Sequence, residues 1–146
     1  MLQPVPRMAL VAAAALIVVT CGSSPSAPAP LDLAGTWNGS MTDSVAGPST
    51  IQVVISQSGT TLTGTWTQTF PDSNLNALET QLGGNFGALS GSTQATTVAL
   101  LLAPQRSQAC SYPIALTATT STMSGNWTFD SSCLIVDGGT VTLTKQ

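Results

Sequence analysis

Residues able to do chemistry are few in this chain, and their types exclude several mechanisms. The 146 residues include no histidine, three cysteines, three basic and six acidic side chains. Without histidine, the Ser-His-Asp and Cys-His schemes lack their base, and a zinc or haem site lacks its usual ligands. Three basic side chains cannot neutralise a run of phosphates, so we expect no nucleic-acid binding. We also expect no catalytic residues, no metal and no cofactor.

The N-terminal cysteine follows a targeting pattern. Arg7 precedes an apolar run of 12 residues, Met8 to Val19, which is shorter than the roughly 20 residues of a transmembrane helix and typical of a signal-peptide core. Residues 22–30 (GSSPSAPAP) are rich in Pro, Ser and Ala, which predicts an extended tether.

The segment Val18-Val19-Thr20-Cys21 resembles the lipobox of bacterial lipoproteins. The resemblance implies a signal peptide over 1–20, lipidation of Cys21, and a lipid anchor in the bacterial envelope. Gly22 after the cysteine implies the outer membrane of a Gram-negative host, with the protein facing the periplasm or the exterior. The alternative is a plain secretory signal with a chance cysteine. Removing residues 1–20 leaves two basic and six acidic side chains, so charge would not draw the chain to anionic lipid.

The remaining residues, 31–146, predict one all-β domain. Over Leu62–Phe70 the odd positions are all threonine and the even positions carry Leu, Gly, Trp, Gln and Phe. Such alternation predicts an antiparallel strand with one buried and one solvated face. Ile51, Val53 and Ile55 alternate in the same way.

Eight such strands are expected, over about 35–43, 49–58, 61–70, 83–92, 96–103, 110–119, 122–130 and 138–145. Closing them into an eight-stranded antiparallel up-and-down barrel removes both sheet edges and encloses the apolar face. A β-sandwich is the alternative. In the fourth strand Phe86 and Leu89 have opposite parity, which predicts a bulge near Gly87.

An internal repeat supports this interpretation. Leu33–Trp37, Leu62–Trp66 and Met123–Trp127 share the order apolar, small, Gly, polar, Trp. The glycine lies on the same face as the Trp, which leaves room for a neighbouring indole or for strong strand curvature.

Residues 72–82 leave two interpretations open. Asp72 could cap a helix, Leu75, Leu78 and Leu82 recur at helical spacing, and Gly83 could end it. Such a helix could lie across a barrel mouth. An ordered loop is the alternative, because two turns are too short to stand without packing.

Cys110 and Cys133 are predicted to form a structural disulfide. If Ser121-Thr122 is the tip of the hairpin between the sixth and seventh strands, Ile114 faces Phe129, Leu116 faces Trp127, and the two thiols face each other. An exported protein favours such a bridge.

The segment Leu33-Ala-Gly-Thr-Trp37 resembles the first strand of lipocalin-like and avidin-like barrels, in which Gly-x-Trp closes the barrel floor. Residues 31–146 as a whole resemble uncharacterised bacterial lipoproteins of lipocalin-like form. Biotin binding is disfavoured, because Met123 stands where an avidin-like site has Trp.

Two functional classes follow. The first is a non-catalytic module that either binds a small apolar or uncharged ligand, through Trp37, Trp66, Trp127 and Gln68, or has a barrel filled with side chains. Its partners would be the membrane, through the lipid, and that ligand. The less favoured class is a barrel enzyme with a carboxylate base. Asp130 and Asp137 flank one loop and are expected to form turns rather than bind a cation.

Overall fold

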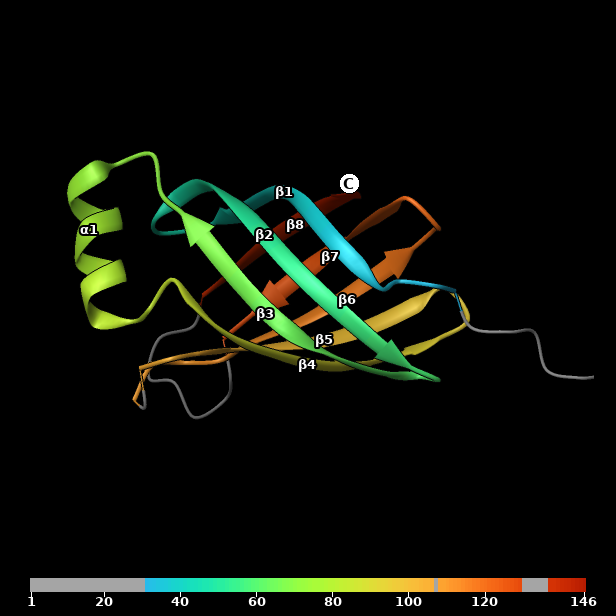
Figure 1. Ribbon diagram of the computed structural model, residues 1–146. Coiled ribbons are helices and arrows are strands. Elements are labelled where there is room, and N and C mark those ends of the chain that lie inside the picture. Colours follow the sequence, from blue (N-terminus) through green and yellow to red (C-terminus); the bar gives the residue numbers. More distant parts are fainter. Residues whose placement is uncertain (1–30, 107, 130–136) are drawn as a thin grey trace, which may run out of the picture.

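The structure is a computed structural model that describes residues 31–106, 108–129 and 137–146. Its described part contains eight strands and one helix, arranged along an elongated barrel (Figure 1). The elements are β1 (Gly35–Asp43), β2 (Gly47–Ser58), β3 (Thr61–Thr69), α1 (Ser73–Leu82), β4 (Phe86–Gln94), β5 (Thr97–Pro104), β6 (Tyr112–Ala118), β7 (Thr122–Thr128) and β8 (Gly138–Lys145).

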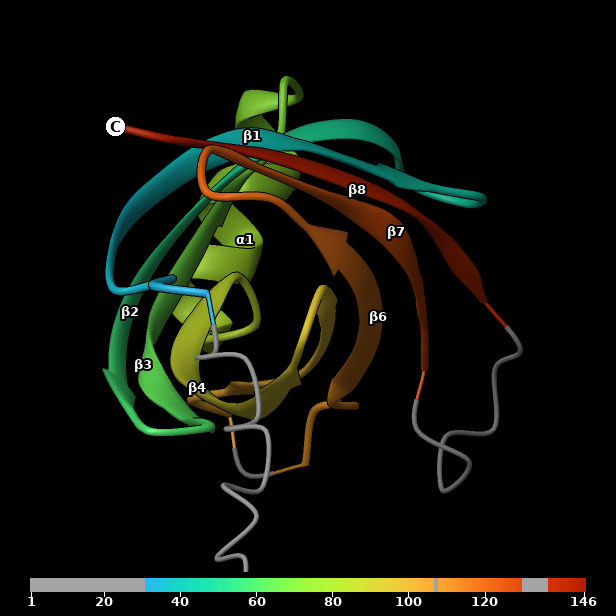
Figure 2. The same cartoon turned by 90° about the vertical axis from the view of Figure 1, so that its right-hand side faces the viewer.

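The strands form a closed antiparallel barrel in which each strand pairs with its neighbours in the sequence. Closure comes from β1 and β8, which pair from Trp37 opposite Lys145 to Met41 opposite Val141. The view along the barrel shows the complete ring of strands (Figure 2). The predicted eight-stranded up-and-down barrel is therefore confirmed, and the sandwich alternative is excluded.

Alternation along each strand fills the interior with apolar side chains. In β3, Leu62 and Trp66 point inward and are at most 2% exposed, whereas the threonines between them are exposed. The same inward set from the other strands forms one core cluster. Its members are Leu33, Trp37, Met41, Ile51, Val53, Ile55, Leu62, Trp66, Leu89, Val98, Leu100, Leu102, Ile114, Leu116, Ala118, Met123, Trp127, Val141 and Leu143.

The repeated glycines stand where neighbouring strands come closest. A Cβ on Gly64 would collide with the carbonyl oxygen of Val54, and a Cβ on Gly125 with that of Ala115. In each pair the adjacent strand's backbone occupies the space of the missing side chain. These glycines therefore permit the strong coiling that closes a small barrel, and the curvature interpretation of the repeat holds for these two copies.

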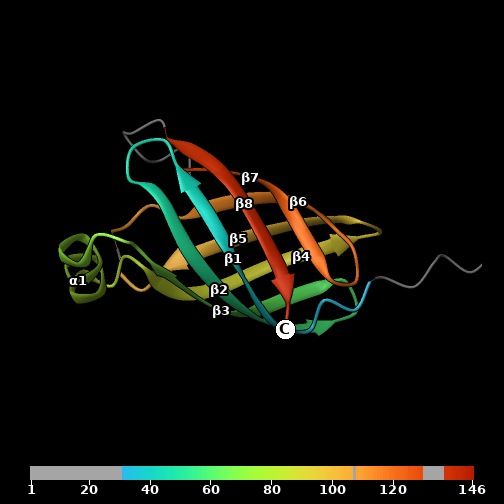
Figure 3. The same ribbon diagram turned by 90° about the horizontal axis from the view of Figure 1, so that it is seen from above.

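The two ends of the barrel differ. The hairpin end is defined by residues 57–61, 94–97, 118–122 and 145–146, where short turns connect the strands. Backbone hydrogen bonds link neighbouring tips there, such as Thr93 N–H to Thr60 O and Lys145 N–H to Ser121 O, both at 2.9 Å. At the helix end, defined by 43–47, α1, 104–112 and the loop before β8, the connections are mostly longer. Viewed from above, α1 lies beyond the ends of β3 and β4 (Figure 3).

Residues 73–82 form a helix, which decides the open question about this segment. Asp72 caps it by accepting hydrogen bonds from the N–H groups of Asn74 and Leu75, at 2.8 and 3.0 Å. Gly83 ends it in the left-handed conformation, with φ +70°. None of the ten helical residues is buried, so α1 is held by its caps and by the barrel end rather than by a share of the core.

The bulge expected near Gly87 is wrong. Pairing of β4 with β3 runs without interruption from Thr67 opposite Phe86 to Thr61 opposite Ser92. Phe86 has opposite parity to Leu89 because its side chain belongs to the outer face, beside α1, where it lines a pocket with Asn76 and other polar residues. A partly buried aromatic side chain on the outer face accounts for the break in the pattern.

The register expected for the β6–β7 hairpin is also wrong. Ile114 pairs with Trp127 and Leu116 with Gly125, rather than with Phe129 and Trp127. The two-residue tip is Thr120-Ser121, one position earlier than expected, because Thr119 faces Thr122 and donates its N–H to the Thr122 carbonyl at 2.8 Å. Each partner on β7 is thereby shifted by two residues. Cys133 lies outside the described residues, so this register leaves the disulfide prediction untested.

Candidate functional site

The three tryptophans proposed to contact a ligand lie in the core at two different levels. Trp37 is 0%, Trp66 2% and Trp127 1% exposed. Trp37 lies toward the hairpin end and donates its indole N–H to the Leu33 carbonyl at 2.9 Å. Trp66 and Trp127 lie toward the helix end, where their indoles donate to the carbonyls of Ala103 at 3.4 Å and Thr42 at 2.7 Å. All three indole rings are thus buried inside the barrel, and each indole N–H is bonded to a backbone carbonyl.

An aromatic cluster occupies the helix end of the interior. Tyr112 is at its centre, with ring-centroid distances of 5.7 Å to Trp66, 5.2 Å to Trp127 and 5.2 Å to Phe129. Trp127 and Phe129 meet edge to face at 5.3 Å. Edge-to-face contacts of this kind add to the stabilisation from burial. Tyr112, which the sequence analysis did not identify, therefore connects two of the predicted tryptophans, Trp66 and Trp127.

Tyr112 also lies in the field of the carboxylates at this end. Burial, and to a lesser extent the negative charges of Glu79, Asp43 and Asp137, together raise the pKa of Tyr112 to about 12. Both effects disfavour the phenolate. The hydroxyl therefore remains protonated at neutral pH and can donate a hydrogen bond.

Asp137, just before β8, is a buried carboxylate with polar neighbours. Burial acts to raise its pKa, but hydrogen bonds from the Ser44 hydroxyl and the Gly138 N–H, with a smaller contribution from the Ser44 N–H, outweigh it and hold the pKa below its ordinary value. Asp43 in turn accepts the N–H groups of Val45 and Ala46. Asp137 thus fixes the β1–β2 turn to the start of β8, as a turn-forming aspartate would, while Asp130 lies outside the described residues.

Gln68, the remaining proposed ligand residue, begins a polar path from the interior to α1. Its side-chain amide donates to the Ser49 hydroxyl at 2.8 Å, and Ser49 donates to the Met41 carbonyl at 3.1 Å. Gln68 is 4% exposed and its backbone N–H binds the Asn85 carbonyl at 2.7 Å. This inward amide is therefore satisfied inside the protein on its donor side.

A small pocket of about 200 Å³ lies between α1 and the ends of β3 and β4. Asn85, 5% exposed, connects the two by donating to the Thr80 hydroxyl at 2.9 Å and, more weakly, to Asn76 Oδ1 at 3.4 Å. The side-chain oxygen of Asn85 has no partner in the described part of the chain. The lining carries amides, hydroxyls and one aromatic ring, from Thr67, Gln68, Thr69, Asn76, Thr80, Asn85 and Phe86.

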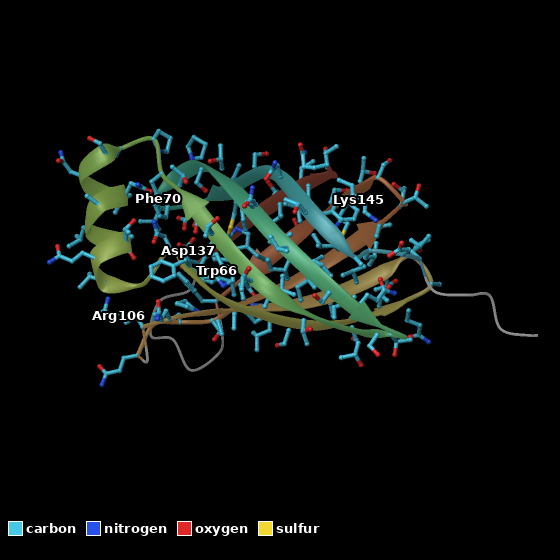
Figure 4. The ribbon with its side chains drawn as sticks, in the orientation of Figure 1. Trp66, Phe70, Arg106, Asp137 and Lys145 are labelled. Carbon is cyan, nitrogen blue, oxygen red and sulfur yellow. The ribbon has the colours of Figure 1, made fainter. Side chains whose placement is uncertain are left out.

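Charged side chains divide between the two ends, as Figure 4 shows for Arg106 and Asp137 at one end and Lys145 at the other. Within the described ranges, no group of three His, Cys, Asp or Glu side chains is placed to hold a metal ion. Among those same residues, no helix has the length and apolar character needed to span a bilayer.

Of the proposed lipidation and disulfide residues, only Cys110 belongs to the described part of the chain. Cys21 and Cys133 lie outside the described residues, so both modifications stay predictions. Cys110 lies in the loop between β5 and β6, at the helix end. Sequence reasoning missed Tyr112, Ser49 and Asn85. Of these, Ser49 at the inward parity of β2 and Tyr112 at the inward parity of β6 carried a signal that could have been used.

Comparison with known proteins adds to the fold alone. No protein-family model matches this chain, and no curated protein does. A solved structure described as a redesigned β-barrel superposes with a TM-score of 0.57 and 18% sequence identity, covering 78% of this chain and 91% of that one. A likeness at this identity supports the eight-stranded barrel architecture and carries no function.

Proposed function

We propose that this chain is a non-catalytic envelope lipoprotein whose barrel is a filled structural module rather than a ligand carrier. The observation that carries the proposal is the state of the three tryptophans: each is at most 2% exposed and each indole N–H is bound to a backbone carbonyl. An eight-stranded barrel either fills with side chains or holds one small ligand. Indoles packed in this way favour the filled alternative.

The lipid anchor rests on the sequence. A short apolar segment, a cysteine in a lipobox-like context and a Pro-rich tether support it together. Two acyl chains suffice for stable anchoring. Replacing Cys21 by Ala should move the protein from the membrane to the soluble fraction, with Cys110→Ser as a matched cysteine control that stays at the membrane. Unchanged partition of Cys21→Ala would contradict the anchor.

A disulfide between Cys110 and Cys133 is part of the same proposal. The two cysteines flank the β6–β7 hairpin in sequence, with Cys110 two residues before β6 and Cys133 between the end of β7 and the start of β8. A loop of this size is stabilised by roughly 3 kcal/mol on the chain-entropy estimate. Cys110→Ser should lower the melting temperature under oxidising conditions only, and an equal loss in the presence of reductant would argue against the bridge.

A second candidate function is binding of a small uncharged molecule at the helix end. The pocket between α1 and the barrel supports it, because its lining is uncharged and includes the predicted residue Gln68. At about 200 Å³ it is smaller than the roughly 300–1,000 Å³ of pockets for drug-sized ligands, so any occupant would be small. A carboxylate-based enzyme is less well supported, because the lowered pKa of Asp137 makes it a weak general base.

Native mass spectrometry of protein purified from its own envelope tests these alternatives, with the denatured mass measured on the same sample. For a filled barrel we expect equal masses, with lipid and disulfide accounting for any difference from the sequence. A mass excess that disappears on denaturation would indicate a bound molecule and overturn the filled-barrel proposal. Gln68→Leu, which removes the inward amide, should abolish such an excess if the helix-end pocket holds the molecule.

A further inference from the structure

The N-terminal segment is fixed at one particular end of the barrel. Gln57 receives the Leu33 N–H on its side-chain oxygen at 2.7 Å, and its amide donates to the Leu31 carbonyl at 2.8 Å. Leu33 is 0% exposed and its carbonyl accepts the Trp37 indole N–H. Leu31, where the described chain begins, is therefore held at the hairpin end, and the start of β1 lies opposite α1 (Figures 1 and 3).

The charge of the described residues is arranged along the same axis. At the hairpin end Asp32 and Lys145 cancel each other, and Lys145 donates to the Asp32 carbonyl at 3.0 Å. The hairpin tips carry no other charged side chain. At the helix end, four carboxylates and one guanidinium leave a net charge of three negative. These groups are Asp43, Asp72, Glu79, Asp137 and Arg106.

The distance between the two ends is large compared with electrostatic screening. Strands of nine residues, such as β1 and β3, rise by about 3.3 Å per residue and tilt by roughly 40° in small barrels, which gives a height of about 23 Å. The Debye length in physiological salt is about 8 Å. An anionic surface touching one end would therefore act weakly on charges at the other end.

We propose that the hairpin end is the membrane-facing surface, and that it rests against an anionic bilayer with the helix end turned away from it. This inference rests on the proposed anchor at Cys21. Residues 21–30 would span about 31 Å if extended at about 3.1 Å per residue, as their Pro-rich sequence predicts, which allows the barrel end that carries them to lie against the lipid. The reverse orientation would stretch the tether back along the barrel and bring three net negative charges to an anionic surface.

The test compares two labelled positions on the lipidated protein. Thr120→Cys places a thiol on the β6–β7 tip at the hairpin end, and Val45→Cys places one on the 79% exposed β1–β2 turn at the helix end. Each variant carries an environment-insensitive fluorophore and is reconstituted into vesicles of phosphatidylethanolamine and phosphatidylglycerol that contain a headgroup-nitroxide lipid. The parent chain treated with the same reagent measures background labelling, and unchanged melting temperatures verify that both variants fold.

We expect the label at position 120 to be quenched at least about twofold more than the label at position 45, because the two lie at opposite ends of the barrel. Equal quenching, or stronger quenching at 45, would overturn the orientation while flotation of the protein with the vesicles still supports the anchor. Absence of flotation would overturn the anchor and the orientation with it.

A charge variant tests the electrostatic part separately. Glu79→Lys on α1 makes the helix end less negative, so the ratio of quenching between 120 and 45 should fall toward one. Asp32→Asn at the hairpin end is the matched control and should keep or increase the ratio. The same ratio in Glu79→Lys as in the parent, on anionic vesicles at low salt, would contradict a role for the charge distribution.

Discussion

The hairpin end and the helix end of this barrel are built on different principles. At the hairpin end, short turns and tip-to-tip hydrogen bonds close a mouth that Leu33 and Trp37 fill completely. At the helix end, longer connections carry a helix without buried residues, a small polar pocket and an aromatic cluster surrounded by carboxylates. Tightly packed apolar side chains therefore close one end, while polar and ionisable side chains gather on the connections at the other, as on other rigid scaffolds.

The largest expected difference between the ends concerns truncation of an apolar side chain. Trp37→Ala should destabilise the protein by about 3–5 kcal/mol, because it removes a fully buried indole. Leu78→Ala on α1, where the side chain is 51% exposed, should change stability by less than about 0.5 kcal/mol. Urea unfolding followed by tryptophan fluorescence measures both. Similar losses of stability in the two variants would contradict the difference in packing between the two ends.

A smaller effect is expected from adding a methyl group at a point of close strand approach. Gly64→Ala should cost about 2–3 kcal/mol, because the Val54 carbonyl occupies the space of the new Cβ. Gly59→Ala at the β2–β3 tip is the matched control. No described atom lies within 4 Å of that Cβ, so only the positive φ of +60° opposes it, at about 1 kcal/mol. Equal melting temperatures would show that the strands can separate without cost.

The attachment of the N-terminal segment predicts a further loss. Gln57→Ala removes three side-chain hydrogen bonds, to Leu33 N, Leu31 O and Gly59 O, and should cost about 1–2 kcal/mol. Gln52→Ala, an exposed neighbour on β2 that donates only to Asn38, should be nearly neutral. Amide hydrogen exchange at Leu33 should accelerate in the first variant alone, and unchanged protection there would contradict the role of Gln57.

Asp137 predicts a pH dependence confined to the helix end. Because its pKa is lowered in the folded state, its contribution to stability is present above the ordinary aspartate pKa of about 3.9 and is lost as the pH falls through the lower folded value. Asp137→Asn should therefore lower the melting temperature by a few degrees at neutral pH, and the difference should vanish in acid. A difference that persists unchanged in acid would assign the effect to shape rather than charge.

The smallest effect at neutral pH concerns Tyr112, the chain's single tyrosine. Its near-ultraviolet absorbance should report ionisation with a pKa of about 12, raised from 10.0. Because the folded state holds this proton more tightly, its contribution to stability is complete below pH 10 and is lost as the pH rises toward 12. Titration near 10 in the folded protein would show that the aromatic cluster is open to water.

Much of the barrel could be predicted because the residues of each strand alone show which of its faces is buried. Alternating threonine and apolar positions, as in Leu62–Phe70, show the face of each strand without knowledge of its partners. The β6–β7 register was not predictable in this way. Thr119–Thr122 offers four hydroxyl residues and no glycine to mark the tip, and a shift by two residues keeps every side chain on its own face.

The candidate site was less predictable, because its parts come from distant segments. Trp66 and Trp127 follow the strand pattern, but Tyr112 joins them from the start of β6, 46 positions beyond Trp66 in the sequence. Asn85 follows α1, and its contacts with Thr80 and Asn76 exist only once the helix has formed. Single-sequence patterns describe faces of elements and do not describe which loops converge.

The hydrogen bonds of Gln57 have a mechanical consequence. A pulling force on the N-terminal segment would reach the barrel at Leu31 and Leu33 and pass through Gln57 to the tip of the β2–β3 hairpin. The covalent chain after Leu33 would also carry the load into β1, which pairs with β2 over Gly35–Asp43 and with β8 over Trp37–Met41. Force directed along a strand with two partners loads many hydrogen bonds at once, in shear. The fold is thus arranged to resist extension by a force applied to its N-terminal segment.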